Sequence, residues 1–208
     1  MKPNSDIGVI LFDYGGVLAV EGFQNGLYAL ARSHGFDPEA FFTAAAEAIY
    51  ASGYVTGQGS EADFWALLSS ATGLPPYRPA FTNEILDRFV LRPALLAAVD
   101  RLRQAGYTLA ILSDQTDWLD RLDRRDGFFT HFDAVFNSYY LGKGKRDPSL
   151  FHDIAQHLSS VPQRILFIDD NPGHIERANT QGLQTHLFTD QTSCLSFLQQ
   201  QTDLSFQP

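Results

Sequence analysis

The chain has 208 residues, of which 44% are hydrophobic and 19% charged, and its net charge is −9. This length and composition fit one globular domain, or a core with a modest insertion. The acidic balance, without a basic run, argues against nucleic acid and anionic membranes as partners. No apolar stretch approaches the length of a membrane span, and no signal peptide is recognisable. With one cysteine, Cys194, expected to be a small buried hydrophobe, we expect a cytoplasmic protein, monomeric or homodimeric.

The first predicted strand is an apolar run, Val9 to Phe12, which ends at Asp13 and is followed by Gly15 and Gly16. A strand that is apolar throughout is typical of a parallel sheet covered by helices on both faces. Asp13 would then stand at the carboxyl edge of the sheet, where open α/β folds bind their ligands. The two glycines allow the backbone to turn sharply beside such a ligand.

A long region without a predicted strand follows, in which apolar residues recur at helical spacing. Its last predicted helix covers Ile85 to Val90. We therefore expect residues 21–91 to form an α-helical insertion, the cap, between the first strand and the rest of the sheet. Residues 1–20 and 92–208 would form the α/β core.

From Arg92 onward, helices and strands alternate. The predicted helices are Pro93 to Ala105, Trp118 to Leu122, Pro148 to Leu158 and Ile175 to Thr180, and the predicted strands are Tyr107 to Leu112, Ala134 to Phe136, Arg164 to Ile168 and Thr185 to Phe188. This alternation predicts an α/β fold with a doubly wound parallel sheet. The glutamine-rich segment from Gln199 to Gln207 is expected to be a frayed tail.

Polar groups follow three of the predicted strands, namely Asp13, Ser113 and the pair Asp169-Asp170. If the strands are parallel, these groups meet at one edge of the sheet. Clustered carboxylates repel one another unless a cation joins them, and their hard oxygen atoms suit Mg²⁺. Lys143 or Lys145, in a glycine-rich stretch, could hold a phosphate in the same crevice. A nucleophile, a hydroxyl, a lysine and a metal site are what phosphoryl transfer through an aspartyl-phosphate needs.

Four motifs in this order resemble those of the haloacid dehalogenase-like (HAD) superfamily, and they span nearly the whole chain. They are Phe12-Asp13-Tyr14-Gly15-Gly16-Val17, Leu112-Ser113-Asp114, Gly144-Lys145-Arg146-Asp147-Pro148-Ser149-Leu150-Phe151 and Phe167-Ile168-Asp169-Asp170-Asn171-Pro172. The resemblance implies a Rossmann-like core with a small helical cap. It is greatest to the sugar-phosphate phosphatase branch that includes α-D-glucose-1-phosphatase, which implies a small phosphate ester as substrate.

The resemblance also implies roles for individual residues. Asp13 would be the nucleophile, and the substrate would contact Ser113, Asp114, Lys145 and Gly16, with Lys143 as the second choice for the lysine. Mg²⁺ would be held by the Asp13 carboxylate, the Gly15 carbonyl and an acid of the fourth motif. Asp170 is preferred for direct ligation, whereas Asp169 would either ligate or orient a metal-bound water.

Two positions depart from the family pattern. Most phosphatases of the family carry a second aspartate where this chain has Gly15, and that residue protonates the leaving oxygen. Because acid–base help is commonly worth about 10²–10⁴ in rate, we expect a slower enzyme, a preference for good leaving groups, or an acid recruited from elsewhere. The second departure is Asp114, where asparagine is usual. Its carboxylate would accept backbone N–H bonds, replace the missing acid, or pair with Arg146.

Two other functions remain open. A 2-haloacid dehalogenase would use the same nucleophile on carbon without a metal, but the paired acids Asp169 and Asp170 argue for metal and phosphate. A non-catalytic binding protein would have no need to keep the nucleophile, hydroxyl, lysine and acid together. Among possible substrate contacts, Glu21 and Phe23 follow the first motif closely, whereas helical spacing makes Tyr50, Tyr54 and Trp65 candidates for the cap interior first.

Overall fold

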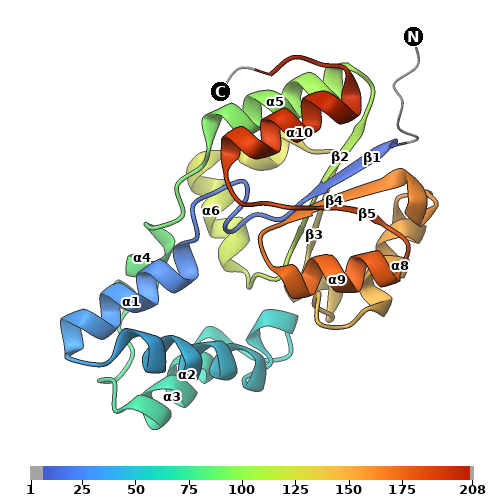
Figure 1. The fold of residues 1–208 in the computed structure, drawn as a ribbon. Coiled ribbons are helices and arrows are strands. Elements are labelled where there is room, and N and C mark those ends of the chain that lie inside the picture. The colour runs from blue at the N-terminus through green and yellow to red at the C-terminus, as the bar shows by residue number, and fades with distance from the viewer. Residues whose placement is uncertain (1–6, 207–208) are drawn as a thin grey trace.

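A five-stranded parallel sheet forms the centre of the computed structural model, which describes residues 7–206 (Figure 1). The strands are β1 (Val9–Phe12), β2 (Thr108–Ser113), β3 (Ala134–Asn137), β4 (Ile165–Asp169) and β5 (Gln184–Leu187), and their order across the sheet is β3-β2-β1-β4-β5. The central strand is therefore β1, with β2 and β3 on one side of it and β4 and β5 on the other. Such a reversal of strand order leaves a crevice at the carboxyl ends of β1 and β4, where ligands bind in open α/β sheets.

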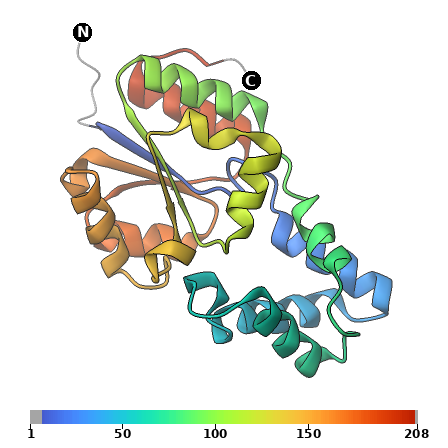
Figure 2. The same ribbon diagram turned by 180° about the vertical axis from the view of Figure 1, so that it is seen from behind.

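Helices cover both faces of the sheet, as the sequence predicts (Figures 1 and 2). One face, which carries Ile10 and Phe12 of β1, packs against α5 (Pro93–Gln104), α6 (Trp118–Asp126) and α10 (Gln191–Thr202). The opposite face, which carries Val9 and Leu11, packs against α8 (Ser149–His157) and α9 (Pro172–Thr180). The smaller elements are α7 (Ser138–Leu141), η2 (Phe128–His131) and η3 (Pro162–Arg164). The predicted doubly wound α/β fold is confirmed.

The cap helices lie between β1 and β2 in the sequence and form a group beside the sheet (Figure 1). They are α1 (Gly22–His34), α2 (Pro38–Ala51), η1 (Tyr54–Thr56), α3 (Glu61–Thr72) and α4 (Pro79–Leu86). The predicted helix over Ile85 to Val90 is wrong, because α4 begins at Pro79, which suits the first helical turn, and ends at Leu86. Val90 instead accepts a hydrogen bond from the N–H of Val20.

The two chain segments that connect cap and core are paired with each other. Val20 N donates to Val90 O at 2.8 Å, and Arg92 N donates to Leu18 O at 2.9 Å. Between these bonds Ala19 forms an antiparallel bridge with Leu91. Cap and core are thus joined by one short two-stranded ribbon, called here the linker ribbon.

The glutamine-rich end, expected to be a frayed tail from Gln199 to Gln207, is helical as far as Thr202. The last core helix, α10, extends to Thr202, and its N-terminus is capped by Asp190, which accepts a bond from Ser193 N at 2.9 Å. Leu198 is fully buried, and Cys194 is buried as predicted. Packing of this apolar side against the core stabilises the whole helix, including its polar glutamines. Gln207 lies outside the described residues. Along residues 7–206, no helix has the length and apolar character that crossing a membrane requires.

Candidate active site

The pairing of β1 with β4 brings the nucleophile candidate to the fourth motif. Phe12 is in register with Ile168, and Asp13 N donates to Ile168 O at 2.9 Å. Asp13 therefore follows β1 directly beside Asp169, the last residue of β4. Ser113 ends the neighbouring strand β2 and is also buried. The groups that the sequence places at strand ends thus meet at one edge of the sheet, next to a cavity of about 500 Å³.

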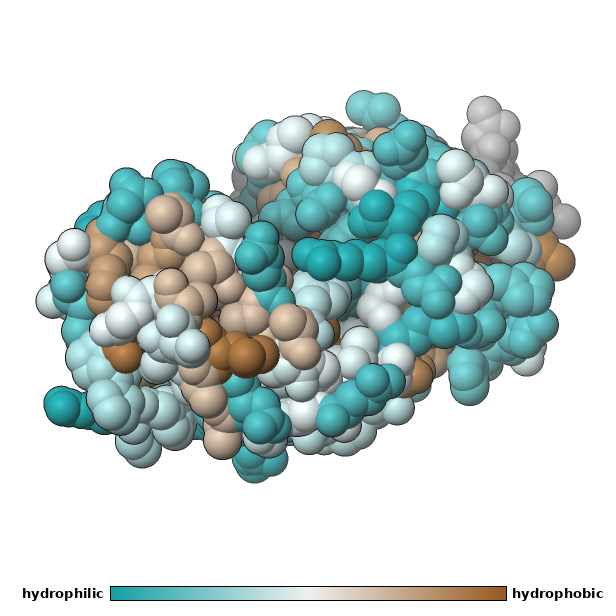
Figure 3. All heavy atoms as spheres, turned by 90° about the horizontal axis from the view of Figure 1, so that it is seen from below, coloured by the Kyte–Doolittle hydropathy of each residue, from teal (hydrophilic) through white to brown (hydrophobic). Residues whose placement is uncertain are grey.

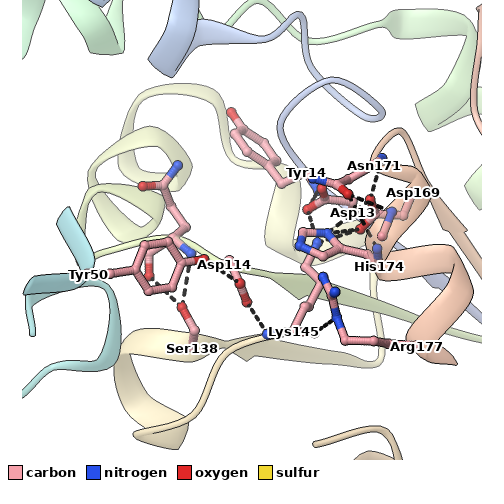
Figure 4. A network of polar contacts seen from close by, with 12 residues as sticks. Asp13, Tyr14, Tyr50, Asp114, Ser138, Lys145, Asp169, Asn171, His174 and Arg177 are labelled. Atoms are coloured by element: carbon pink, nitrogen blue, oxygen red, sulfur yellow. Dashed lines mark hydrogen bonds and ion pairs between the residues drawn. The ribbon is translucent and has the colours of Figure 1, made fainter. Parts of the chain in front are cut away.

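A single buried lysine lies within this group (Figure 4). Lys145 is fully buried, and its Nζ lies 2.6 Å from Asp169 Oδ2 and 2.9 Å from Asp13 Oδ1. Burial opposes the ammonium charge, but the carboxylates of Asp13 and Asp169 more than offset it and raise the pKa of Lys145. Lys143, the second choice from sequence, points elsewhere and pairs with Asp153 at 2.6 Å. The geometry thus assigns Lys145 to the site.

Asp169 is held by several donors. It accepts bonds from Lys145 Nζ and, at 2.8 Å, from Asn171 N, while His174 Nδ1 lies 3.2 Å from both carboxylate oxygens. Burial by itself would raise the pKa of Asp169, but Lys145 and His174 hold it below its usual range. The sequence analysis did not identify His174. Its place in the first turn of α9, directly after the fourth motif, is the only signal that pointed to it.

Three carboxylates, those of Asp13, Asp169 and Asp170, offer oxygen atoms that lie within 4.8 Å of one another. Burial raises the pKa of Asp13 well above its usual value, and the charges of Asp169 and Asp170 add to this rise against the opposing effect of Lys145. The pKa of Asp170 is also raised, first by burial and then by Asp169. One ammonium therefore faces three acids, and the cluster carries an excess of negative charge.

Gly16 makes room for Asp170. Its φ is +80°, which L-residues with a side chain rarely adopt, and a Cβ at this position would lie 2.0 Å from Asp170 Oδ2. The carboxylate of Asp170 takes the space that this glycine leaves, and the hard oxygen donors thus brought together fit a Mg²⁺ ion. Asp13 and Asp170 would hold the ion, since both oxygens of Asp169 are engaged by Lys145, Asn171 and His174, whereas Asp13 meets Lys145 through Oδ1. Gly15 borders the cavity, and ligation by its carbonyl stays a prediction.

Asp114 anchors the loop that carries the lysine. It accepts a bond from Lys145 N at 2.8 Å and another from the hydroxyl of Tyr50 at 3.0 Å. The backbone hydrogen bond expected from the sequence is therefore present. The Arg146 guanidinium lies over the ring of Tyr50, 3.5 Å from its centre. It therefore contacts this aromatic ring, and the alternative of an ion pair with Asp114 is not what the structure has. Asp114 consequently joins the core to the cap through α2.

Comparison with known proteins agrees with this geometry. Residues 7–179 match the family model of haloacid dehalogenase-like hydrolases. The chain belongs to this family of hydrolases.

Known relatives of this HAD-like hydrolase differ in what they act on. Rat (Rattus norvegicus) bifunctional epoxide hydrolase 2 is 29% identical over 133 residues, which is 61% of this chain but only 24% of that protein, so the chain spans about a quarter of the relative's length. A HAD family enzyme from Bacteroides thetaiotaomicron, solved in complex with magnesium and inorganic phosphate, is 19% identical with a TM-score of 0.72, covering 91% of this chain and 98% of that one. L-2-haloacid dehalogenase from Xanthobacter autotrophicus, with chloropropionic acid covalently bound, is 21% identical with a TM-score of 0.63, covering 91% and 81%. At these identities the structures show a common fold alone.

The cap contributes a mostly apolar wall to the cavity of this hydrolase. The lining residues from the cap and the linker ribbon's edge are Glu21, Phe23, Gln24, Phe42, Ala46, Ile49, Tyr50, Val55 and Phe89. Glu21 and Phe23 line the cavity, and their contact with a substrate stays a prediction, whereas Tyr50 faces the site although helical spacing indicated the cap interior. Tyr54 and Trp65 are buried inside, bonded to Asp117 and Thr82 respectively.

Two further features of the cavity wall matter for its chemistry. Glu21 Oε1 accepts a bond from Gln24 N at 2.9 Å and so caps α1. Burial raises the pKa of Glu21, and the charge of Asp170 adds to this effect, although the bond from Gln24 opposes it. On the core side, Arg177 of α9, which the sequence analysis also missed, donates from Nε to Lys145 O at 2.8 Å. This bond helps to hold the loop that carries Lys145.

Proposed function

We propose that this HAD-like hydrolase is a Mg²⁺-dependent phosphatase of small phosphate monoesters, with Asp13 as nucleophile. The observation that carries the proposal is the cluster of Asp13, Asp169 and Asp170 around one lysine. An anionic substrate would be repelled by this excess of negative charge unless a divalent cation bound there. A dehalogenase acting without metal would have no use for the third carboxylate, which favours phosphate over haloacid.

The residues divide the chemistry between them. An oxygen of Asp13 forms a bond to phosphorus while the bond to the ester oxygen breaks, which leaves a phosphorylated aspartate. Lys145 balances the charge of the phosphoryl oxygens, and the hydroxyl of Ser113 is placed to donate a hydrogen bond to one of them. Water then cleaves the acyl phosphate and restores Asp13. When bound, Mg²⁺ would neutralise and orient the phosphoryl group.

Hydrolysis assays with three compounds test this function: an anomeric sugar phosphate, hexyl phosphate and 2-chloropropionate. We expect phosphate release that requires Mg²⁺ and that falls by at least about 10³ in Asp13→Asn, since the amide is not a nucleophile. Halide release without metal would instead identify a dehalogenase. A wild-type protein that binds phosphate esters and releases nothing from any of them would identify a binding protein.

The apolar wall favours substrates whose leaving group is itself apolar. Each buried methylene contributes about 0.8 kcal/mol, and 1.4 kcal/mol corresponds to a factor of ten. Hexyl phosphate and glucose 6-phosphate both release a primary alcohol, so they differ mainly in the group that meets Phe23, Phe42 and Phe89. We expect kcat/KM to be about 10–100-fold higher for hexyl phosphate.

A chain-length series provides the control for this preference. From ethyl to hexyl phosphate, kcat/KM should rise about fourfold per methylene, because each added methylene moves from water to the apolar wall. A flat series, or a preference for glucose 6-phosphate, would contradict an apolar substrate and restore the sugar phosphate that the sequence resemblance implies.

The wider setting follows from charge and cysteine content. We infer that the hydrolase acts in the cytoplasm on free small molecules, as a monomer or homodimer. Its net charge of −9 disfavours nucleic acid and anionic membranes, and its single cysteine is buried.

A further inference from the structure

The proposed reaction needs a proton at the ester oxygen. An alkoxide is a poor leaving group, so its departure is slow unless an acid protonates it as the bond to phosphorus breaks. Most acids and bases near the cavity are already engaged. Asp13 is the nucleophile, Asp169 is bonded to Lys145 and His174, and Asp114 accepts two hydrogen bonds. The donor has to come from another part of the cavity wall.

Glu21 stands at the required place. Its Oε1 is fixed by Gln24 N, whereas its Oε2 is directed at the loop that follows the nucleophile. A Cβ built on Gly15 would lie only 3.0 Å from Glu21 Oε2. Because Gly15 has no side chain, the carboxyl group of Glu21 fills the space in front of this loop, two residues beyond Asp13. It borders the same cavity as Asp13, Lys145 and Asp170.

We propose that Glu21, at the start of the cap, is the proton donor and acceptor of the phosphatase reaction, in place of a side chain at position 15. In the first step the ester oxygen takes the Glu21 proton as its bond to phosphorus breaks, so the alcohol leaves neutral and Glu21 becomes a carboxylate. In the second step the carboxylate takes a proton from the water that attacks phosphorus. Phosphate leaves, and both Asp13 and the protonated Glu21 are restored.

The N-terminus of α1 fixes the position of the Glu21 side chain. The side chain serves as the N-cap of α1, so its rotamer is set by the helix and not by the substrate. Its position just past the linker ribbon, at the first cap residue, keeps it close to the core.

The proposal rests on the proposed function, and leaving-group dependence tests it separately. In Glu21→Gln, the Oε1 acceptor for Gln24 N is kept while the proton is lost. Hexyl phosphate releases a strongly basic alkoxide, whereas p-nitrophenyl phosphate releases a weakly basic phenolate that needs no acid. We expect kcat/KM to fall by about 10²–10⁴ for hexyl phosphate and by less than about tenfold for p-nitrophenyl phosphate.

Rapid mixing gives a second readout. Because Glu21→Gln also lacks the base for the water step, p-nitrophenol should appear in a burst close to the enzyme concentration, followed by a steady rate well below that of the wild type. Asp37→Asn is the matched control, since Asp37 caps α2 in the same way, through Ala40 N at 2.8 Å, but lies on the cap surface. It should leave both esters unaffected.

Equal losses on the two esters without a burst would overturn the proposal, because a misaligned cap would slow both reactions alike. Unchanged hydrolysis of hexyl phosphate by Glu21→Gln would overturn it as well. Failure of the proposed function is recognised independently, since the wild-type protein would then hydrolyse neither ester. Thermal unfolding of both variants checks that the cap remains folded.

Discussion

Lys145→Met is expected to slow phosphate release strongly and to destabilise the folded protein. Methionine keeps the length of the side chain but leaves Asp13 and Asp169 without the ammonium that lies 2.9 Å and 2.6 Å from them. Breaking a buried ion pair on one side costs about 3–5 kcal/mol of folding free energy. Loss of a group that balances transition-state charge lowers kcat by about 10²–10³ or more. Steady-state kinetics and urea unfolding at pH 7 measure the two effects.

The stability loss in Lys145→Met should shrink on acidification. In the wild type Lys145 helps hold the pKa of Asp169 low, so the stabilisation by Asp169 is complete above its unfolded pKa of about 3.9 and fades as pH falls through the lower folded value. Without the lysine the carboxylates of the folded variant take up protons at higher pH than those of the unfolded chain. Its stability therefore rises as pH falls from 7 toward 4, and the rise is larger than in the wild type, where Lys145 opposes the rise in the pKa of Asp13 and lowers the pKa of Asp169.

Lys143→Met is the matched control for Lys145→Met. Lys143 pairs with Asp153 near the surface, and both side chains remain partly exposed to solvent. Such pairs contribute about 0–1 kcal/mol, so stability should change little and hydrolysis should be retained. Inactivation by Lys143→Met together with normal activity of Lys145→Met would reverse the assignment of the two lysines.

Gly16→Ala is expected to impair Mg²⁺ binding and with it hydrolysis. Alanine at φ +80° costs about 1–2 kcal/mol, and its Cβ would lie 2.0 Å from Asp170 Oδ2. The Asp170 carboxylate has to move away, so one oxygen ligand leaves the cluster. We expect the affinity for Mg²⁺ to fall by about 10–100-fold, the range found when groups that position a ligand are lost. Calorimetric titration with Mg²⁺ measures this directly.

Gly35→Ala separates the backbone effect from the clash. Gly35 ends α1 with φ +77°, and no atom lies within 4 Å of a Cβ placed there. It should therefore show a similar loss of stability with unchanged Mg²⁺ affinity. If Gly16→Ala bound Mg²⁺ as tightly as Gly35→Ala, Asp170 would not be a ligand.

The strand ends were predictable because they depend on local pattern. Apolar runs that stop at Asp13, Ser113 and Asp169 determine which edge of a parallel sheet holds the site, and the structure has them there. The partners of these residues were not predictable in the same way. His174 on Asp169 and Tyr50 on Asp114 depend on how α9 and α2 pack, which no spacing in the chain records.

The two errors in secondary structure have a common cause. The glutamines after Leu198 are typical of a tail because they are polar. The helix α10 continues through them because its apolar side packs on α5, a contact that the local pattern does not indicate. Val90 looks helical because it follows an apolar helix, yet its carbonyl is used by Val20 in the linker ribbon. In both places a long-range contact decides what the local pattern leaves ambiguous.

The linker ribbon also determines how the cap can move. Because the two segments are hydrogen-bonded to each other from Leu18 to Arg92, neither segment could bend alone if the cap were to open. Such an opening would also have to break the hydrogen bond between Tyr50 and Asp114. Tyr50 on α2, far from the linker ribbon, would then be displaced more than Glu21, which directly follows it. The proposed acid would thus remain close to the loop after Asp13 while the cavity edge formed by α2 opened.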